Sequence, residues 1–187
     1  IISLSKYNID VDFYAPNRAQ SDVIDHLTQT AETHSRNILV EASRITRGNI
    51  SPLEEFNAQR YSAVILPGGF GAVKNFSDFL HKGVVANLTP DIQKALDDAL
   101  THNLWIVGIC AAPLIIALAL RDHNLSNCTI TFGELEDNHD FNNALKSWKI
   151  QHINTKINEI NIDREHKLIT SGAYMFHDAS PYDIYCC

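Results

Sequence analysis

The stretch "WIVGICAAPLIIALAL", from Trp105 to Leu120, joins a short β-like apolar run to a longer helical one, with Cys110 at the junction. Gly108 permits a tight backbone approach, and the two alanines after the cysteine are small enough for strand and helix to pack closely. Pro113 suits the first turn of a helix, where backbone N–H groups have no intrahelical acceptor. The pattern is typical of a nucleophile elbow with cysteine in place of serine. A buried, inert core cysteine is the alternative.

Apolar strand-like runs alternate with helical patterns in the rest of the chain. We expect strands at residues 10–16 and in "SAVILPGG", "LWIVGI", "CTITFG", "INEINID" and "KLITSGAYM". Helices are expected in "SRNILVEASRITRG", "TPDIQKALDDALTHN", "APLIIALALRDHN" and "DFNNALKSWK". This alternation predicts an α/β fold whose mainly parallel sheet is covered by helices on both faces. Ligands bind beyond the carboxyl ends of the strands in such sheets, which is where Cys110 is expected.

Composition limits the classes of partner and compartment. The 187 residues carry a formal net charge of −7, with no basic block, which disfavours nucleic acid and anionic membranes as partners. The apolar run at 111–120 is about half of what a membrane-spanning helix needs. Four cysteines without a C-x-x-C pair indicate a reducing compartment, and we expect a cytoplasmic protein.

The length predicts one domain over residues 1–187. The chain begins in what resembles the last turns of a helix, and it stops where a helix begins at Ser180 and Pro181. We therefore expect a domain that lacks its first strand at the N-terminus and its final helix at the C-terminus.

A second informative turn, "LPGGFGAVKNFS", follows the strand pattern at residues 62–66. Its glycines at 68, 69 and 71 allow a ligand to approach peptide N–H groups closely. The turn lacks the Lys-Ser/Thr of a nucleotide P-loop and does not match G-x-G-x-x-G. It is either an anion- or oxyanion-binding loop or a plain tight turn.

Together, "ILPGGFGAVKNFS" and "GICAAP" resemble the ThiJ/PfpI superfamily, relatives of the glutamine amidotransferase domain. More narrowly, "APNRAQSDVIDHL", "SRNILVEASRITRG", "LPGGFGAVKNFSDF" and "TSGAYM" are similar to the ElbB family of glyoxalase-like proteins. The resemblance implies a flavodoxin-like three-layer sandwich that forms homodimers. It implies conversion of small dicarbonyls such as glyoxal and methylglyoxal to hydroxy acids without a cofactor.

The resemblance also assigns roles to residues. Cys110 matches the nucleophile, and the backbone N–H groups of Gly69 and Ala111 match the oxyanion hole. Peptidase members carry histidine where this chain has Ala111, and no late His–Glu pair of an amidotransferase is evident. The partner carboxylate of the superfamily belongs to the first strand or the helix after it, so we assign no residue to that role.

Other residues are expected around the pocket from their place in the fold: Gly68, Phe70, Gly71, Asn75, Pro113, Arg44, Arg47 and Tyr174. For Arg44 the alternative is a solvated helix face, with Glu41 as an i,i+3 partner. His139 and His177 are candidate acid–base groups or solvated loop residues. No His or Cys pairs have metal-ligand spacing, so we expect no metal. Cys128 is interpreted as structural, whereas Cys186 and Cys187 receive no role.

Two functional hypotheses follow. The first is a cofactor-independent glyoxalase-type enzyme that acts on small reactive carbonyls through Cys110. The second is a non-enzymatic amidotransferase-like module in which Cys110 senses oxidants or the pocket binds a partner. Both need an accessible thiolate, so the sequence does not separate them.

Overall fold

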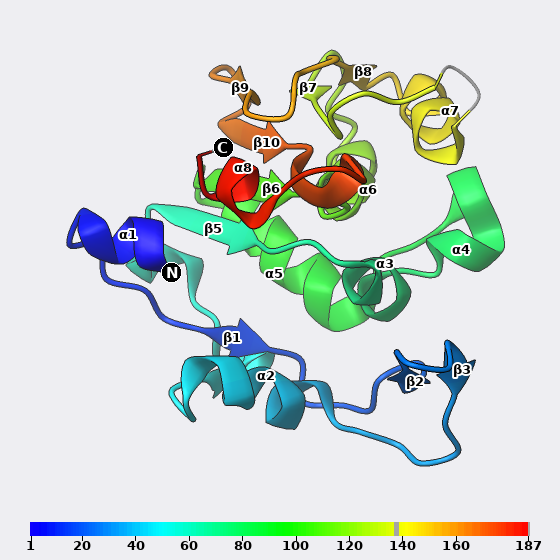
Figure 1. The fold of residues 1–187 in the computed structure, drawn as a ribbon. Coiled ribbons are helices and arrows are strands. Elements are labelled where there is room, and N and C mark those ends of the chain that lie inside the picture. The colour runs from blue at the N-terminus through cyan, green and yellow to red at the C-terminus, as the bar shows by residue number, and fades with distance from the viewer. Residues whose placement is uncertain (137–138, 187) are drawn as a thin grey trace. The chain divides into compact units, whose positions relative to one another are not determined.

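The computed structural model describes residues 1–136 and 139–186, and the chain divides into two compact units (Figure 1). The first unit comprises residues 1–56, and the second comprises residues 57–187. Cys187, to which the sequence assigned no role, lies outside the described residues.

The first unit contains short elements around one amphipathic helix. Its elements are α1 (Ile2–Lys6), β1 (Tyr14–Ala15), β2 (Ile24–Asp25), β3 (Thr30–Ala31), α2 (Ile38–Thr46), β4 (Ser51–Pro52) and the 3₁₀ turn η1 (Leu53–Glu55). Strands β1 and β4 pair in parallel, while β2 and β3 form an antiparallel hairpin. The Asn37 side chain accepts the Val40 N–H and caps α2. Arg47 ends α2 in the left-handed conformation at φ 56°, one residue before the expected stop at Gly48.

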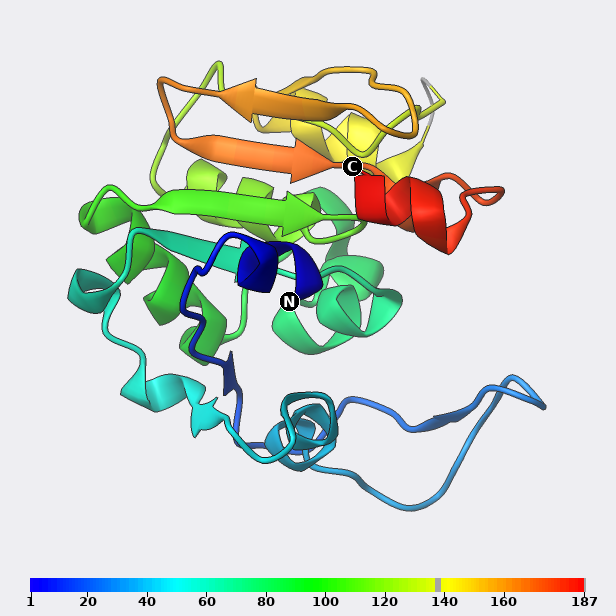
Figure 2. The same cartoon turned by 60° about the vertical axis from the view of Figure 1, so that its left-hand side comes forward.

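The second unit is built on a four-stranded sheet in the order β5-β6-β10-β9 (Figure 2). Its strands are β5 (Ala63–Leu66), β6 (Trp105–Ile109), β10 (Leu168–Ser171) and β9 (Ile160–Asp163). The pairs β5–β6 and β6–β10 are parallel, whereas β9 is antiparallel to β10. The short strands β7 (Thr129–Ile130) and β8 (Gln151–His152) form a further parallel pair. The expected α/β class with a mainly parallel sheet is confirmed.

Helices and 3₁₀ turns connect these strands. They are η2 (Ala58–Arg60), α3 (Phe70–Phe76), α4 (Phe79–Lys82), η3 (Gly83–Val85), α5 (Pro90–Thr101), α6 (Pro113–Asp122), α7 (Asp140–Ser147), η4 (Ala173–Met175) and α8 (Pro181–Cys186). Helices α5 and α6 lie on the same side of the sheet, behind it in Figure 2. Both begin with proline at the first helical position, as expected.

The core lies between the sheet and α6. Every residue of α6 from Pro113 to Leu120 is buried, and so are the β6 and β10 residues that face it, including Ile106, Leu168 and Thr170. The alternate residues Ile65, Ile160 and Ile162 point to the other side of the sheet and are 41–42% exposed. Side chains on opposite faces of the same strand therefore differ sharply in burial.

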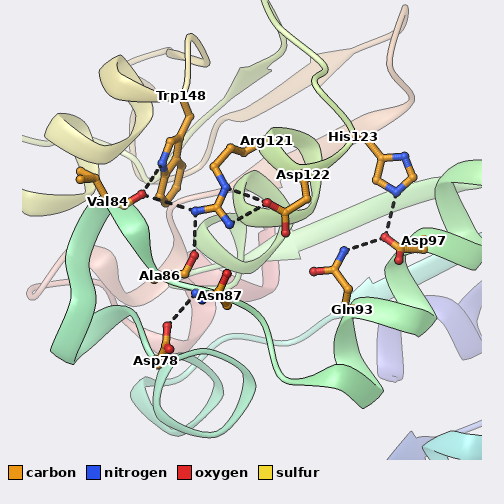
Figure 3. A network of polar contacts seen from close by, with 10 residues as sticks. All are labelled: Asp78, Val84, Ala86, Asn87, Gln93, Asp97, Arg121, Asp122, His123 and Trp148. Atoms are coloured by element: carbon orange, nitrogen blue, oxygen red, sulfur yellow. Dashed lines mark hydrogen bonds and ion pairs between the residues drawn. The ribbon is translucent and has the colours of Figure 1, made fainter.

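A network of polar contacts links the end of α6 to η3 and α7 (Figure 3). The Arg121 guanidinium donates to the carbonyl oxygens of Ala86, at 2.7 Å, and Val84, at 3.4 Å. It also pairs with Asp122 and lies 5.3 Å from the centre of the Trp148 ring. The Trp148 indole N–H donates to the same Val84 carbonyl at 2.9 Å. A helix end, a 3₁₀ turn and a second helix are thus held at one point.

The same view shows a second link, between α5 and the residue after α6. The Asp97 carboxylate accepts a hydrogen bond from the Gln93 amide at 2.7 Å and contacts His123 Nε2 at 2.8 Å.

None of the helices in the described part of the chain has the length and apolar character that a membrane span needs.

Candidate active site

Cys110 lies at a sharp turn between β6 and α6. Its backbone φ angle of 62° is in the left-handed region, and Cys110 is partly exposed. The Cys110 N–H donates to the Ser171 carbonyl of β10 at 2.9 Å, and the Ala112 N–H donates to the Ile109 carbonyl at 3.1 Å. Helix α6 starts at Pro113. The strand, left-handed residue and helix form the predicted elbow.

Small residues allow this turn to form. A Cβ at Gly108 would lie 2.7 Å from the Ile116 side chain and 3.1 Å from the Pro113 nitrogen. Ala111 is 5% exposed, and Ala112 is fully buried. Larger side chains at these positions would separate strand from helix, because the interior is already close-packed.

The glycine turn after β5 packs directly against the elbow. A Cβ placed on Gly68 would overlap the Ile109 carbonyl oxygen, and it would lie 2.5 Å from the Cys110 Cβ and 3.1 Å from the Ala111 nitrogen. Gly69 follows with φ 101°, which L side chains rarely adopt, and α3 begins at Phe70. The family resemblance assigns N–H groups from both turns to one oxyanion hole, and the structure brings the two turns together.

Two peptide N–H groups flank this junction. In the ranges 1–136 and 139–186, the Gly69 and Ala111 N–H groups donate to no backbone acceptor. Backbone donors that are not used within the fold can bind a developing negative charge. These are the two donors that the family resemblance assigns to an oxyanion hole, a role that stays a prediction.

The remaining residues of the glycine turn form the helix α3. The Asn75 side-chain amide donates to the Gly71 carbonyl at 2.8 Å, so it is used within the helix. Phe70 is 59% exposed, and the Lys74 ammonium lies 5.6 Å from the centre of its ring. Their placement in a pocket around Cys110 stays a prediction.

The three other candidate pocket residues differ in their surroundings. Arg44 pairs with Glu41 at 3.0 Å, and its side chain is 71% exposed. This is the solvated i,i+3 pair considered from the sequence. Arg44 and Arg47 both belong to the first unit. Tyr174 lies in η4, directly after β10, and is 52% exposed.

Neither candidate histidine is hydrogen-bonded to Cys110 in the described part of the chain. His139 is the N-cap of α7, where its Nδ1 accepts the Phe141 N–H at 3.1 Å. His177 is exposed in the segment between η4 and α8. Any acid–base role of either imidazole stays a prediction.

The carboxyl end of β10 contributes more to the elbow than the sequence indicated. Ser171, the last residue of β10, accepts the Cys110 N–H through its carbonyl. The next residue, Gly172, packs against Gly133, whose backbone lies 2.7 Å from the position of a Cβ on Gly172. The glycines in "CTITFG" and "TSGAYM" were the sequence signals for this second close approach.

A pocket of about 310 Å³ lies elsewhere in the second unit, at α7 and β8. Its lining residues are Leu135, Asn142, Lys146, Ile150, Gln151, His152 and Asn154. Cys110 and the glycine turn are not among them, so the elbow rather than this pocket defines the candidate site.

One of the residues that line this pocket, His152, has a lowered pKa. Burial is the main cause, and the nearby charge of His139 is the second.

Comparison with known proteins assigns the chain to a superfamily. The chain is 32% identical to human mitochondrial glutamine amidotransferase-like class 1 domain-containing protein 3, covering 97% of this chain and 69% of that protein. It is 30% identical to the mitochondrial ES1 protein homolog of Rattus norvegicus, over 94% of this chain and 66% of that one. The chain belongs to the class I glutamine amidotransferase-like superfamily. No family model matches the sequence.

A solved structure extends this assignment to the fold. The chain matches an isoprenoid biosynthesis protein with an amidotransferase-like domain from Ehrlichia chaffeensis, with a TM-score of 0.86 and 26% identity. The match covers 99% of this chain and 82% of that one. The expected flavodoxin-like architecture is therefore confirmed.

The expectation of a cytoplasmic location is wrong by the same comparison. The human, rat and Danio rerio relatives are all named mitochondrial. The expectation rested on cysteine usage, which reports a reducing environment and does not distinguish one reducing compartment from another.

Proposed function

We propose that this superfamily member is a cofactor-independent glyoxalase-type enzyme that converts glyoxal or methylglyoxal to a hydroxy acid through Cys110. The observation that carries the proposal is the junction of two turns. Cys110 is partly exposed and has a left-handed backbone, and Gly68 packs against its Cβ. The Gly69 and Ala111 N–H groups flank the same junction.

The reaction begins at the sulfur. The Cys110 thiolate attacks the aldehyde carbon, and the carbonyl π electrons move to oxygen, which gives a hemithioacetal alkoxide. The N–H groups of Gly69 and Ala111 stabilise this oxygen, since preorganised donors cost little reorganisation when charge develops. The first step thus uses only groups that the two turns bring together.

The second half of the reaction is an internal redox exchange between adjacent carbons. A base removes the proton from the former aldehyde carbon and returns it to the neighbouring carbonyl carbon. The oxygen on that carbon takes up a proton from solvent, so the product is a thioester with an adjacent hydroxyl. Water then attacks the thioester and releases the hydroxy acid and the free thiol. The sum adds one water to the dicarbonyl and needs no external oxidant or reductant. We assign no residue of this chain as the base.

Turnover measurements test the proposal. The protein is assayed with glyoxal and methylglyoxal in the absence of added thiol, with glycolate and lactate measured as products. Cys110→Ala should lose at least about 100-fold in rate, because the nucleophile is gone. Cys186→Ala is the matched control, since Cys186 is an exposed thiol at the end of α8.

The outcomes separate the two functional hypotheses. Equal rates in the wild type and Cys110→Ala would contradict a role for this thiol. No turnover in any variant, together with selective peroxide oxidation of Cys110, would favour the redox-sensing alternative.

A further inference from the structure

A second cluster of potential ligands lies at the opposite end of the sheet from the elbow. Cys128 precedes β7, Asp163 ends β9, and His166 lies in the turn that leads to β10. Their sulfur, carboxylate oxygen and imidazole nitrogen atoms all lie within 4.8 Å of one another. Asp163 is paired with Leu168 at the start of β10, whereas the elbow follows the carboxyl end of β6.

The cluster is buried and oriented by hydrogen bonds. Cys128 is fully buried, while the side chains of Asp163 and His166 are 7% and 19% exposed. One Asp163 oxygen accepts the Thr129 N–H at 2.8 Å and contacts His166 Nδ1 at 2.9 Å. The other accepts the His166 backbone N–H at 3.0 Å. The carboxylate is therefore fixed, and the imidazole is turned toward it.

The three side chains suit a borderline divalent ion. Thiolate, imidazole and carboxylate are the usual zinc ligands, with metal–ligand distances of about 2.0–2.3 Å. Tetrahedral geometry at those distances places the ligand atoms about 3.5 Å apart. A change of at most about 1.3 Å in the separation of any two ligand atoms would convert the observed cluster into such a set.

The Cys128 thiol has two acidic neighbours, Asp163 and Glu165. A divalent cation would balance their negative charges and stabilise the deprotonated thiol, as metal ions do for coordinating thiols.

We propose that Cys128, Asp163 and His166 form a structural binding site for a zinc-class divalent ion, with water as the fourth ligand. On binding, the Cys128 proton passes to solvent, and a neutral imidazole nitrogen supplies its lone pair. The ion would link the start of β7 to the β9–β10 hairpin. The proposal does not depend on the function proposed for Cys110, because the two sites lie at opposite ends of β6 and β10. It replaces the expectation of no metal, which considered only residues close in sequence.

Cobalt substitution tests which thiol binds the metal. The protein carries Cys186→Ser and Cys187→Ser, is treated with a chelator and is then titrated with Co²⁺. We expect one equivalent to produce tetrahedral d–d bands and a thiolate-to-cobalt charge-transfer band in the near ultraviolet. Adding Cys128→Ser should abolish the charge-transfer band, and adding Cys110→Ser should leave it unchanged.

Zinc affinity provides a second readout. Zinc affinity is measured by competition with a chromophoric chelator in the protein that carries Cys186→Ser and Cys187→Ser. Adding His166→Ala to this protein should weaken zinc binding by at least about tenfold. Saturating Zn²⁺ should raise the Tm of the parent protein and not that of Cys128→Ser. Because each protein is compared with and without Zn²⁺, the test stays decisive even if Cys128→Ser is less stable.

Three results would overturn the proposal. The first is the absence of a charge-transfer band with one equivalent of Co²⁺. The second is loss of the band in Cys110→Ser but not in Cys128→Ser, which would place the metal at the elbow. The third is unchanged zinc affinity in both Cys128→Ser and His166→Ala, which would indicate an adventitious ion only.

Discussion

Cys110 adopts a left-handed backbone at φ 62° without the freedom of glycine. Such a conformation costs about 1–2 kcal/mol at a residue with a side chain, and it persists only where the surroundings hold it. Here the Ser171 carbonyl accepts the Cys110 N–H, and the Gly68 backbone fills the space beside the Cys110 Cβ. The elbow therefore depends on β10 and on the turn after β5, as well as on its own sequence.

Substitutions in the glycine turn should separate close packing from backbone strain. Gly68→Ala should destabilise the protein by about 3 kcal/mol or more, since its Cβ would overlap the backbone of the elbow. Gly69→Ala should lower the free energy of unfolding by about 1–2 kcal/mol. A Cβ at this position would meet no atom within 4 Å, but a φ of 101° is strained for alanine. Urea unfolding measures both. Gly71→Ala, within α3, is the control and should be neutral or slightly stabilising. Equal effects at all three positions would contradict the packing described.

A pH effect is expected at His152. Burial and the charge of His139 lower its pKa from 6.5, so the unfolded chain binds a proton there more readily than the folded chain. The stability that this residue contributes is present above pH 6.5 and is lost as the pH falls below that value. His152→Gln should therefore flatten the fall in unfolding free energy below pH 6.5, whereas exposed His81→Gln should not. A parallel decline in wild type and His152→Gln would refute this assignment.

At the scale of elements, α6 is the helix on which the second unit depends. It is buried along most of its length, and Arg121 in its last turn fixes η3 and α7 through carbonyl and ring contacts. The position of the elbow at the start of α6 thus depends on contacts at the other end of the same helix.

Removing the guanidinium should show the contribution of this network. Arg121→Met keeps the length of the side chain and leaves the Ala86 carbonyl without its charged donor. We expect a loss of about 1–3 kcal/mol in urea unfolding. Lys94→Met is the control, because Lys94 is 67% exposed and pairs with Asp98 on the same helix face. Such a pair is expected to contribute about 0.3–0.5 kcal/mol. A loss in Arg121→Met no larger than in Lys94→Met would show that the network contributes little.

Helix starts were predictable because their signals are local. Proline at positions 90, 113 and 181 marks the first residue of α5, α6 and α8. Ser180 caps α8 as expected, with its hydroxyl accepting the Asp183 N–H at 3.2 Å. Strand lengths were less predictable: the strand expected at residues 10–16 is only Tyr14–Ala15. Strand length depends on the paired partner, which local sequence does not specify.

The same distinction applies to the sites. The elbow was predictable because each of its two turns has a compact local pattern. The cluster of Cys128, Asp163 and His166 was not, since Cys128 is far in sequence from the other two and the packing of β7 beside β9 brings them together.

At the scale of the whole molecule, the second unit holds two thiols in opposite environments. Cys110 is partly exposed at the carboxyl end of β6, and Cys128 is fully buried at the start of β7. Catalysis at Cys110 requires this thiol to be reachable by small molecules, whereas a structural metal site requires Cys128 to be shielded.

Native-state alkylation measures this contrast directly. The folded protein is exposed to iodoacetamide at neutral pH, and peptide mass spectrometry follows modification at each thiol, with exposed Cys186 as an internal reference. We predict that Cys110 is modified in the folded state, whereas Cys128 is modified only after unfolding in urea. A Cys110 thiol as protected as Cys128 would contradict the central claim that the elbow presents a nucleophile to its substrate.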